Sequence, residues 1–391
     1  MTTLSTVRDE GSNRAANGGI KLFHSGDEYF AAVETAIDRA QAYIYLESYI
    51  FADDLLGRRI LATLGRAVQR GVDVRIIVDG IGSYSWTSFL IREAERYGCK
   101  LKVFNRMPWR GIMRWGRMVR LLRNVRKAII GLNRRTHRKL CIIDGTSAFL
   151  GSMNIIEYHC QQYVGARAWR DTGIYVQGED VCVLQDDFLR LWRKKRRRKR
   201  VGRRQRKEMI ESGRRIKLNS KRRLREQNYV DLLVLVLGAQ KRIWIETAYF
   251  VPDRRLVQAL RTVAESGVDV RIMVPAQADV FFIPWVASAF HNSLLLAGVR
   301  VFEYTKTMLH AKTILVDAHG VVGSSNLNHR SLFHDLEADV HFDNTEAVDS
   351  LQRQFLEDMQ ACREVVLDSW YERPALQRLI GRVLLLVRAV L

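Results

Sequence analysis

The chain has 391 residues, of which 47% are hydrophobic and 27% are charged. These fractions are typical of a globular protein, and they exclude a wholly disordered, collagenous or coiled-coil chain. The length favours two domains over one. The charge is unusual, because 63 Lys and Arg against 42 Asp and Glu leave a net charge of +21. Such an excess indicates an anionic partner, either nucleic acid or a membrane surface.

Two segments hold this positive excess. Residues 110–139 contain 11 basic and no acidic side chains, and residues 193–225 contain 19 basic side chains against Glu208 and Glu211. The remaining 328 residues sum to −7. We therefore expect a slightly acidic protein that carries two basic inserts.

Nothing in the sequence indicates a signal peptide or a membrane-spanning segment. The N-terminal residues lack an apolar core, and no run of about 18 uncharged apolar residues occurs. The five cysteines are widely spaced and include no CxxC pair, so we expect neither a disulfide framework nor a cysteine metal site. A reducing compartment is the expected location.

The first half of the chain contains Val/Ile-rich runs without clean alternation, as in strands buried on both faces, and a helical pattern over 54–70. The predicted strands lie in 43–51, 71–80, 98–105 and 137–154. Between the third and fourth runs lie the basic residues of an insertion at about 107–133. Its segment 108–130 gathers Trp, Leu and Val on one helical face and arginines on the rest, which indicates an interfacial membrane helix or a soluble basic helix packed on its own domain.

The second half repeats these patterns in the same order. After an apolar helical pattern at 184–192, the basic run 193–207 has almost nothing to bury, and it is expected to be a solvated tether that clamps anionic lipid or contacts nucleic acid. Beyond it come a strand-like run at 229–238, a helical pattern at 253–266, and runs matching those of the first half at 242–250, 267–275, 298–304 and 310–326.

These patterns predict an α/β fold built from two homologous lobes. The first lobe is expected over 1–192, a polybasic linker over 193–226, and the second lobe over 227–391. Two further apolar stretches are candidates for contact with lipid. Residues 280–290 are either a buried helix beside the site or an entrance for lipid, and the tail 379–391 either lies on a membrane or packs against a lobe.

One sequence block occurs once in each half, as HxKxxxxD followed by GSxN. Residues two apart on an extended strand point to the same face, so His and Lys share one surface, as do Ser and Asn. If the halves pack about a pseudo-twofold axis, these groups surround one gap and suit a single phosphate with a histidine on either side of phosphorus. The block comprises His137, Lys139, Asp144, Gly151, Ser152 and Asn154, and then His310, Lys312, Asp317, Gly323, Ser324 and Asn326.

The paired blocks resemble the HKD motifs of the phospholipase D superfamily, and the resemblance covers nearly the whole chain outside the basic segments. The stretches 133–145 and 169–178, and the run Asn326, Asn328, Arg330, Ser331 and Glu337, are similar to bacterial cardiolipin synthases of the short type without N-terminal transmembrane helices. The resemblance implies two phospholipase D-like lobes, each a mixed, mostly parallel sheet flanked by helices, about a pseudo-twofold axis.

The resemblance also implies a phosphatidyl transfer without metal or other cofactor, in which one histidine attacks the lipid phosphodiester and the other acts as acid and then base. It favours His137 as the nucleophile. Glycerol leaves, and a second phosphatidylglycerol accepts. By the same resemblance, Asp171 and Glu337 would orient the histidines. Asp144 and Asp317 count with the catalytic motif, although a structural role is expected for them. The implied phosphate-binding residues are Lys139, Lys312, Ser152, Asn154, Ser324 and Asn326.

Other polar residues are interpreted more conservatively. Glu47 and Glu246 lie at equivalent places in apolar runs, and a buried carboxylate needs a partner. The motif lysines or histidines are the expected partners, with a structural pairing and a role in the site both open. Tyr49 and Tyr249 are expected in the core or the pocket wall. A structural or surface position is expected for His24, His159, His291, His319, His329, His334 and His341.

The leading hypothesis is a peripheral enzyme of the cytoplasmic face of a bacterial cell membrane, with phosphatidylglycerol as substrate and no nucleic-acid partner. Phosphatidylethanolamine or a small polyol could also serve as acceptor. The alternatives are a phospholipid hydrolase or nuclease of the same superfamily, and a non-catalytic binder of anionic lipid or nucleic acid. Because both motifs are complete, the sequence argues against the non-catalytic binder.

Overall fold

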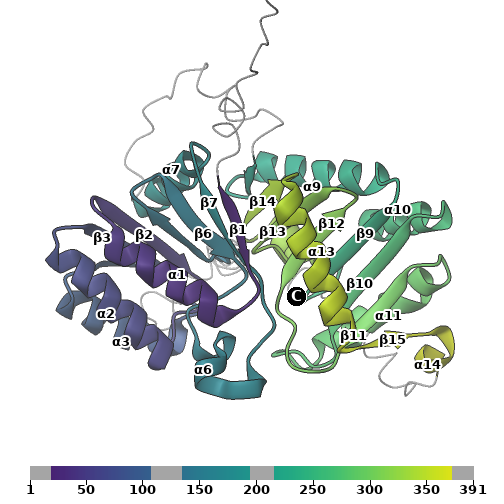
Figure 1. Ribbon diagram of the computed structural model, residues 1–391, viewed down its shortest axis with the longest axis horizontal. Helices are drawn as coiled ribbons and strands as arrows, with labels where there is room; N and C mark the ends of the chain where they lie inside the picture. The colour runs from purple at the N-terminus through teal and green to yellow at the C-terminus, as the bar shows by residue number, and fades with distance from the viewer. Residues whose placement is uncertain (1–18, 107–133, 194–214, 372–391) are drawn as a thin grey trace, which may run out of the picture.

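The structure, a computed structural model, describes residues 19–106, 134–193 and 215–371. They form two lobes that lie side by side, and each lobe is a β-sheet with helices on its faces (Figure 1). The predicted basic helix at 108–130, the run 193–207 apart from Arg193, and the tail 379–391 lie outside the described residues.

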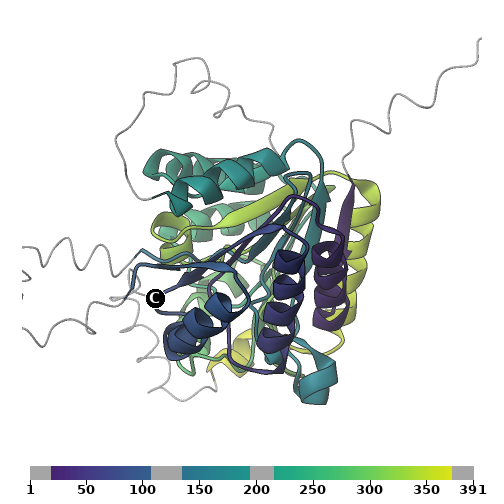
Figure 2. The same cartoon turned by 90° about the vertical axis from the view of Figure 1, so that its left-hand side faces the viewer.

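The first lobe contains a seven-stranded sheet in the order β1-β7-β6-β5-β2-β3-β4. Its strands are β1 (Ile20–Phe23), β2 (Tyr43–Ser48), β3 (Asp73–Asp79), β4 (Lys100–Phe104), β5 (Leu140–Ile143), β6 (Ser147–Gly151) and β7 (Gly173–Gln177). Its helices are α1 (Gly26–Arg39), α2 (Leu55–Gln69), α3 (Thr87–Arg96), α6 (Gln161–Val164) and α7 (Val181–Trp192), with short 3-10 helices η1 (Tyr84–Trp86), η4 (Glu157–His159) and η5 (Gly165–Arg167). Figure 2 shows α1, α2 and α3 laid over the outer face of this sheet.

The second lobe repeats this plan in an eight-stranded sheet with the order β15-β11-β10-β9-β12-β13-β14-β8. Its strands are β8 (Ile216–Leu218), β9 (Arg242–Thr247), β10 (Asp269–Pro275), β11 (Arg300–Tyr304), β12 (Lys312–Val316), β13 (His319–Gly323), β14 (Ala338–Phe342) and β15 (Cys362–Val365). Its helices are α9 (Arg222–Leu237), α10 (Arg254–Glu265), α11 (Ile283–Leu295), α12 (His329–Phe333), α13 (Thr345–Met359) and α14 (Leu367–Tyr371).

The predicted α/β fold and its internal repeat are confirmed, but the sheets are not mostly parallel. Only β2, β3 and β4, and their counterparts β9, β10 and β11, pair in parallel, while every other pairing in the two described sheets is antiparallel. Tight turns cause this difference. Asp144 and Asp317 adopt positive φ angles of 51° and 52° between β5 and β6 and between β12 and β13, and a tight turn joins only antiparallel strands.

The predicted strand at 229–238 is wrong, because this run forms the C-terminal part of helix α9. A short apolar run does not distinguish a strand from a buried helix by periodicity. Here the preceding residues 222–228 continue the helix, and Leu232, Leu233 and Val236 pack against the core of the second lobe. In addition, β8 lies inside the predicted linker and pairs with β14, so the second lobe begins earlier than expected.

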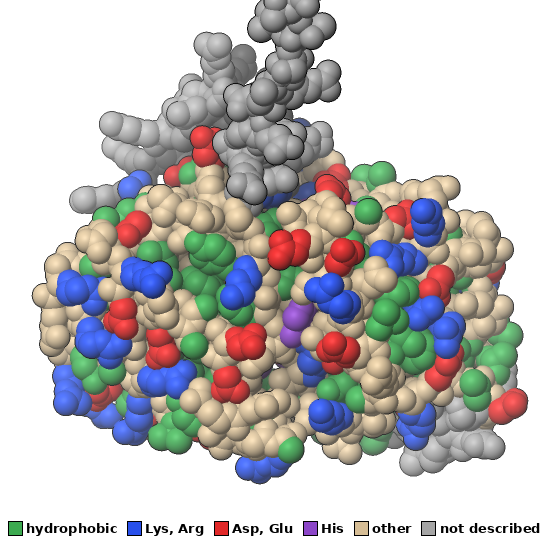
Figure 3. Space-filling view, viewed as in Figure 1, with side chains coloured by type: hydrophobic (Ala, Val, Ile, Leu, Met, Phe, Trp, Pro, Cys, Tyr) green, Lys and Arg blue, Asp and Glu red, His purple; other side chains and the backbone are tan. Residues whose placement is uncertain are grey.

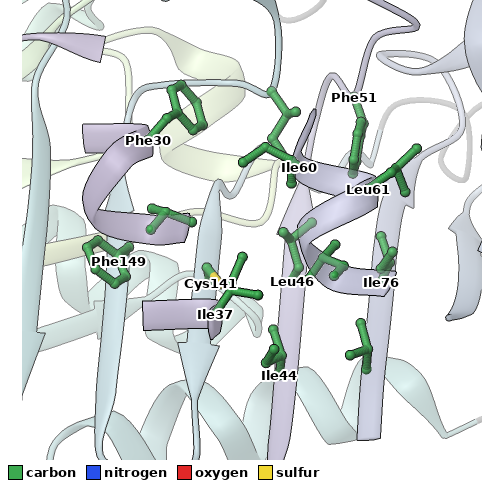
Figure 4. Packing of buried hydrophobic residues seen from close by; sticks show 14 of the residues in the cluster. Phe30, Ile37, Ile44, Leu46, Phe51, Ile60, Leu61, Ile76, Cys141 and Phe149 are labelled. Atoms are coloured by element: carbon green, nitrogen blue, oxygen red, sulfur yellow. The ribbon is translucent and has the colours of Figure 1, made fainter. Parts of the chain in front are cut away.

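Local patterns predicted the helices after β2 and β9 correctly. Helix α2 begins after Asp54, whose side chain accepts a hydrogen bond from the Gly57 N–H, and α10 begins after Asp253, which caps the Leu256 N–H in the same way. In the first lobe, Ile37 of α1 and Ile60 of α2 point onto β2 and its neighbours (Figure 4). This packing holds the central parallel strands, and therefore the loops at their carboxyl ends.

The lobes meet through their antiparallel halves. Strand β6 contacts β13 and β14, and β7 contacts β13. Each lobe also sends its last long helix across the boundary, since α7 contacts β8 and α13 contacts β1 (Figure 1). One hydrophobic cluster spans both lobes and includes Leu150, Val176, Val322 and Val340. The interface is thus continuous core, with a pseudo-twofold arrangement.

One face of the molecule is mixed in charge. Figure 3 shows basic and acidic side chains interspersed over one face of the molecule. Within 19–106, 134–193 and 215–371, no helix combines the length and the hydropathy needed to cross a bilayer. Part of the first basic segment is interior, because Arg135, Arg138 and Lys139 are all buried. All five cysteines are free.

Candidate active site

The two motif histidines lie at the junction of the lobes. His137 precedes β5 and His310 precedes β12, and each of these strands runs antiparallel to the first parallel strand of its sheet. The motifs therefore begin at the carboxyl edge of β2 and of β9. Isolated bridges join Thr136 to Leu336 and Leu309 to Arg170, so each motif is held by the backbone of the other lobe.

Each histidine is oriented by a carboxylate of the opposite half of the chain. His137 Nδ1 lies 3.0 Å from Oε1 of Glu337, and His310 Nδ1 lies 2.7 Å from Oδ2 of Asp171. A carboxylate accepts hydrogen bonds, so Nδ1 carries the proton and Nε2 keeps its lone pair. The predicted orienting residues are thus placed on the histidines, and the pairing is crossed between the lobes.

Burial makes the site unfavourable for additional positive charge. It lowers the pKa of His137 and of His310 well below 6.5, and the motif lysines lower both further. Burial also raises the pKa of Glu337 to about 7 and raises the pKa of Asp171. The free site therefore holds two neutral imidazoles, which suits a nucleophile.

The motif lysines lie next to the histidines. Lys139 Nζ donates to the His137 carbonyl at 2.6 Å, and Lys312 Nζ donates to the His310 carbonyl at 2.6 Å. Burial lowers the pKa of Lys139 to about 7, with repulsion from Lys312 as the next cause, and lowers the pKa of Lys312 to about 8. Each ammonium has three donors, so both can also bind an anion, and an anion would relieve their repulsion.

The motif serines and asparagines differ in what they offer. The hydroxyl of Ser152 donates to Asp171 and that of Ser324 donates to Glu337, so the serines hold the orienting carboxylates in the free site. Their contact with phosphoryl oxygens stays a prediction. Asn154 Oδ1 accepts from the Ile50 N–H at 3.1 Å, which leaves its NH₂ group as a donor for a ligand. Asn326 is buried at the matched position, and its Oδ1 has no hydrogen-bond partner among the described residues.

The motif aspartates lie away from the histidines, at the far ends of β5 and β12. Asp144 accepts hydrogen bonds from the N–H groups of Gln41, Ala42 and Tyr43, and Asp317 accepts from those of 240–242. Their oxygens are taken up by the turn that precedes β2 or β9. The structure therefore does not place Asp144 and Asp317 with the catalytic residues.

Glu47 and Glu246 are buried. Among the described residues, their polar partners are not the motif lysines or histidines expected from the sequence. Thr136 donates to Glu47, whose other oxygen lies 3.8 Å from Arg138 Nη1. Thr313 donates to Glu246, and burial raises the pKa of Glu246 to about 8. Because side chains alternate along a strand, these carboxylates lie beneath the motifs and support them.

Two buried arginines link the lobes, and sequence reasoning did not single them out. Arg138 Nη2 lies 2.7 Å from Asp187 of α7, and its Nε donates to the carbonyl of Glu337. Arg170 donates through Nε to Asp358 of α13 at 2.6 Å. Their positions in the sequence could have identified them, because Arg138 lies inside the first motif and Arg170 directly precedes Asp171.

His159, for which a structural or surface position is expected from the sequence, is buried beside the site. Its Nδ1 lies 3.2 Å from Oδ2 of Asp171, and burial lowers its pKa to about 3. Counting from Asn154 and Asn326, it occupies the position that Ser331 has in the second half, and Ser331 is hydrogen-bonded to Glu337. Alignment of the two halves could have found it.

His159, Asp171 and His310 form a group that could hold a metal ion, since their ligand atoms lie within 4.8 Å of one another. The 2.7 Å between His310 Nδ1 and Asp171 Oδ2 is shorter than the roughly 3.3 Å between two ligands of tetrahedral zinc. Hydrogen bonding explains this spacing directly. That the reaction needs no metal stays a prediction.

Taken as chemistry, the site offers a nucleophilic nitrogen, a second imidazole as acid and base, and cationic donors for a phosphoryl group. The two halves supply matching sets of these groups, and His137 is close enough to His310 to lower its pKa. Such a set suits in-line transfer at phosphorus.

Comparison with known proteins agrees with this description. A family model described as cardiolipin synthase, PLD-like domain matches residues 33–192 and 232–359. The chain is 30% identical to a cardiolipin synthase of Clostridium perfringens, over 98% of this chain and 79% of that protein. It is 29% identical to a probable cardiolipin synthase of Bacillus subtilis, over 95% and 72%.

Two solved structures share the fold. The crystal structure of phosphatidylserine synthase from Haemophilus influenzae superposes with a TM-score of 0.67 at 16% identity and covers 95% of both chains. That of polyphosphate kinase from Porphyromonas gingivalis gives 0.56 at 13% identity, over 89% of this chain and 51% of that one. At these identities the likeness supports the two-lobed architecture alone.

Proposed function

The chain belongs to the cardiolipin synthase family with a phospholipase D-like domain, and from this we propose that it is a phosphatidyltransferase that makes cardiolipin and glycerol from two molecules of phosphatidylglycerol. The observation that carries the proposal is the crossed pair of buried histidines, each with Nδ1 on a carboxylate of the other lobe.

The reaction has two steps. The second histidine enters the reaction as an imidazolium, because the bound anionic phosphodiester favours uptake of a proton from water at its Nε2. Nε2 of the first histidine attacks phosphorus, the bond from phosphorus to the headgroup oxygen breaks, and the imidazolium gives that oxygen its proton, so that glycerol leaves. A hydroxyl of the second phosphatidylglycerol then loses its proton to the second histidine and attacks phosphorus. The phosphorus–nitrogen bond breaks, its electron pair returns to the first imidazole, and cardiolipin is released.

The remaining site residues support these steps. The ammoniums of Lys139 and Lys312 neutralise the phosphoryl oxygens, with the amides of Asn154 and Asn326 as further donors. Glu337 and Asp171 stabilise an imidazolium whenever a histidine holds the proton, as the carboxylate does in other nucleophile–base pairs. The mechanism assigns no step to a metal ion.

The proposed location is the cytoplasmic face of a bacterial cell membrane, as a peripheral protein. The basic segments of the sequence favour an anionic lipid surface, where each basic residue close to the surface contributes about 1 kcal/mol. Removing residues 193–207 should weaken cosedimentation with vesicles of phosphatidylglycerol but not with vesicles of phosphatidylcholine. Unchanged binding would contradict the role of this run.

The function is tested by incubating the purified chain with phosphatidylglycerol vesicles and a chelator, and by analysing the lipids by mass spectrometry. Cardiolipin and free glycerol should appear with the parent protein and not with the His310→Ala variant. Phosphatidic acid alone would identify a hydrolase. If no product forms, the proposal is contradicted, and the same assay is then run with single-stranded DNA and RNA. If product forms only without chelator, the metal-free mechanism is contradicted.

A further inference from the structure

A cluster of aromatic side chains at the start of α11 has no role in the proposed reaction. It consists of Phe281, Phe282 and Trp285, and we call these three residues the aromatic cluster. Phe281 is 72% exposed, the largest fraction of any large hydrophobic side chain in the described residues. Its ring meets those of Phe282 and Trp285 edge to face, at centroid distances of 5.3 Å and 5.8 Å.

Helix α11 holds the aromatic cluster in place. The inner face of this helix packs on the second lobe, where Ile283, Val286 and Ala287 are buried. Single exposed apolar side chains are common on proteins, but adjacent aromatic side chains at the surface indicate a place where another molecule binds. The segment 280–290, expected to be either a buried helix or an entrance for lipid, thus has one buried face and one exposed end.

The aromatic cluster lies at the edge of the second sheet that carries the motif. Strands β9 and β10 are parallel, so their carboxyl ends share one edge, and His310 lies at the same edge because β12 starts beside the end of β9. The loop 276–280 leaves β10 there. Its Asp279 accepts a hydrogen bond from the Tyr249 hydroxyl at 2.6 Å. Burial lowers the pKa of Lys312, and the charge of Asp279 opposes this shift, so the loop lies close to the catalytic lysine.

The first lobe places an exposed aromatic side chain at the matching position. Tyr84 of η1 follows β3 as Phe281 follows β10, and it is 47% exposed. Ser83, directly before it, donates through its hydroxyl to the Tyr49 carbonyl at 2.9 Å. The Tyr49 ring in turn lies 5.1 Å from the His137 ring between centroids. Each half of the site is therefore bordered by an exposed aromatic residue.

Basic side chains are exposed at the same edges. Arg254 and Arg255 begin α10, just beyond the end of β9, and Lys306 follows the end of β11. In the first sheet β4 ends at this edge with Phe104, and the chain enters the basic segment 110–139 shortly after it. Apolar side chains accompanied by positive charge are the combination that binds the surface of a bilayer with anionic lipid.

We propose that the aromatic cluster, together with Tyr84, inserts into the headgroup region of a bilayer that contains anionic lipid, so that the catalytic site faces the membrane. The inference rests on the proposed function, because a lipid substrate is what requires the site to face a bilayer. Aromatic side chains are favoured at this depth of a bilayer. A lipid phosphate can then reach the histidines without complete transfer of its acyl chains into water.

A second exposed apolar surface competes for this role. It lies on α9 and consists of Val230, Val234 and Leu237, which share one helical face. Helix α9 leads into β9, so Leu237 lies at the amino edge of the second sheet, opposite the edge that carries the motif. Leu296, at the other end of α11 from the aromatic cluster, is also exposed. These residues offer matched controls.

Serine substitutions of equally accessible residues test the proposal. Phe281→Ser should raise the apparent Kd for phosphatidylglycerol vesicles about tenfold or more, because the bilayer no longer receives the Phe ring. Leu296→Ser and Val234→Ser remove side chains that are each 65% exposed, and they should change the Kd less than about twofold. Phe281→Leu keeps an apolar side chain and should retain most of the binding. Thermal unfolding of all four variants controls for folding.

Activity measurements separate docking from chemistry. With phosphatidylglycerol in vesicles, Phe281→Ser should lower kcat/KM about tenfold. With dihexanoyl phosphatidylglycerol below its critical micelle concentration, the same variant should stay within about threefold of the parent, because a monomeric lipid needs no docking. Amide hydrogen exchange of residues 278–286 should slow when vesicles are added, and that of residues 230–237 should not.

The choice of an anionic surface has its own test. The combined variant Arg254→Gln, Arg255→Gln and Lys306→Gln should raise the Kd for phosphatidylglycerol vesicles about tenfold or more and leave binding to phosphatidylcholine vesicles unchanged. An unchanged Kd for phosphatidylglycerol vesicles would contradict the electrostatic part of the proposal.

The remaining outcomes overturn the inference or leave it standing. Unchanged vesicle binding by Phe281→Ser would overturn it, and so would weaker binding by Val234→Ser, which would place the docking surface on α9. Equal losses of activity on vesicles and on monomers would show that Phe281 shapes the site instead. A parent that binds vesicles through Phe281 but makes no cardiolipin would refute the proposed function and still support the docking surface, so the two failures are distinct.

Discussion

Replacing Arg170 by Met tests whether the buried arginines hold the lobes together. The Arg170 side chain is 7% exposed, and its guanidinium donates to Asp358 at 2.6 Å and to Thr172 Oγ1 at 3.0 Å. Its own carbonyl accepts from the His310 N–H at 2.8 Å. Although burial opposes the charge, Glu246 and Asp358 raise the pKa of Arg170, so the guanidinium stays ionised.

The expected cost follows from what the substitution leaves behind. Without the guanidinium, the carboxyl groups of Asp358 and Glu246 lie buried together without their cation. Breaking a buried pair of this kind costs about 3–5 kcal/mol. At about 2–4 °C per kcal/mol for a unit of the size of one lobe, the melting temperature should fall by roughly 6–20 °C. Adding Asp358→Leu removes the orphaned charge and should restore most of the loss.

The assay is thermal unfolding at pH 7, followed by circular dichroism. Arg222→Met is the matched control, because Arg222 pairs with Glu226 on the surface with a side chain that is 90% exposed, and its loss should leave the melting temperature unchanged. A melting temperature of Arg170→Met within about 2 °C of the parent would refute the reasoning. So would a double variant no more stable than the single one.

Three further predictions concern single carboxylates. Glu337→Gln should lower kcat by about 10²–10⁴ at nearly unchanged melting temperature, because the imidazolium of His137 loses its counter-charge; a loss below tenfold in the lipid assay would speak against the crossed pairing. Burial raises the pKa of Glu246 to about 8 in the folded state from its ordinary 4.5, so the folded protein holds a proton that the unfolded chain releases, and stability is lost as pH rises through this window. The melting temperature of Glu246→Gln relative to the parent should therefore increase from pH 5 to pH 8.5, and a constant difference would contradict this. Asp144→Ala should lower the free energy of unfolding, measured with urea, by about 1–3 kcal/mol and should leave kcat within about threefold of the parent value. A folded variant with a much lower kcat would show that Asp144 belongs to the catalytic residues.

Sequence patterns predicted the local elements well where one periodicity dominates. The helices after Asp54 and Asp253, the repeated strands and the two motifs occur where expected. The strand expected at 229–238 is part of a helix, since Val and Leu over ten residues suit either state and the decision comes from packing on the second core. The prediction of mostly parallel sheets was wrong for a related reason. Strand direction depends on the turns and the pairing partners, and composition does not determine it.

The sequence by itself determined the fold class, the internal repeat and the identity of both histidines and both lysines, because these depend on residue types at fixed local spacings. Only the tertiary structure decided which groups act on them. His137 meets Glu337 from 200 positions away, and His310 meets Asp171 from 139 positions away, in both cases across the lobe interface. Local spacing carries no information about such contacts. They arise because the two lobes pack their antiparallel halves together, which brings the orienting carboxylate of each lobe onto the histidine of the other.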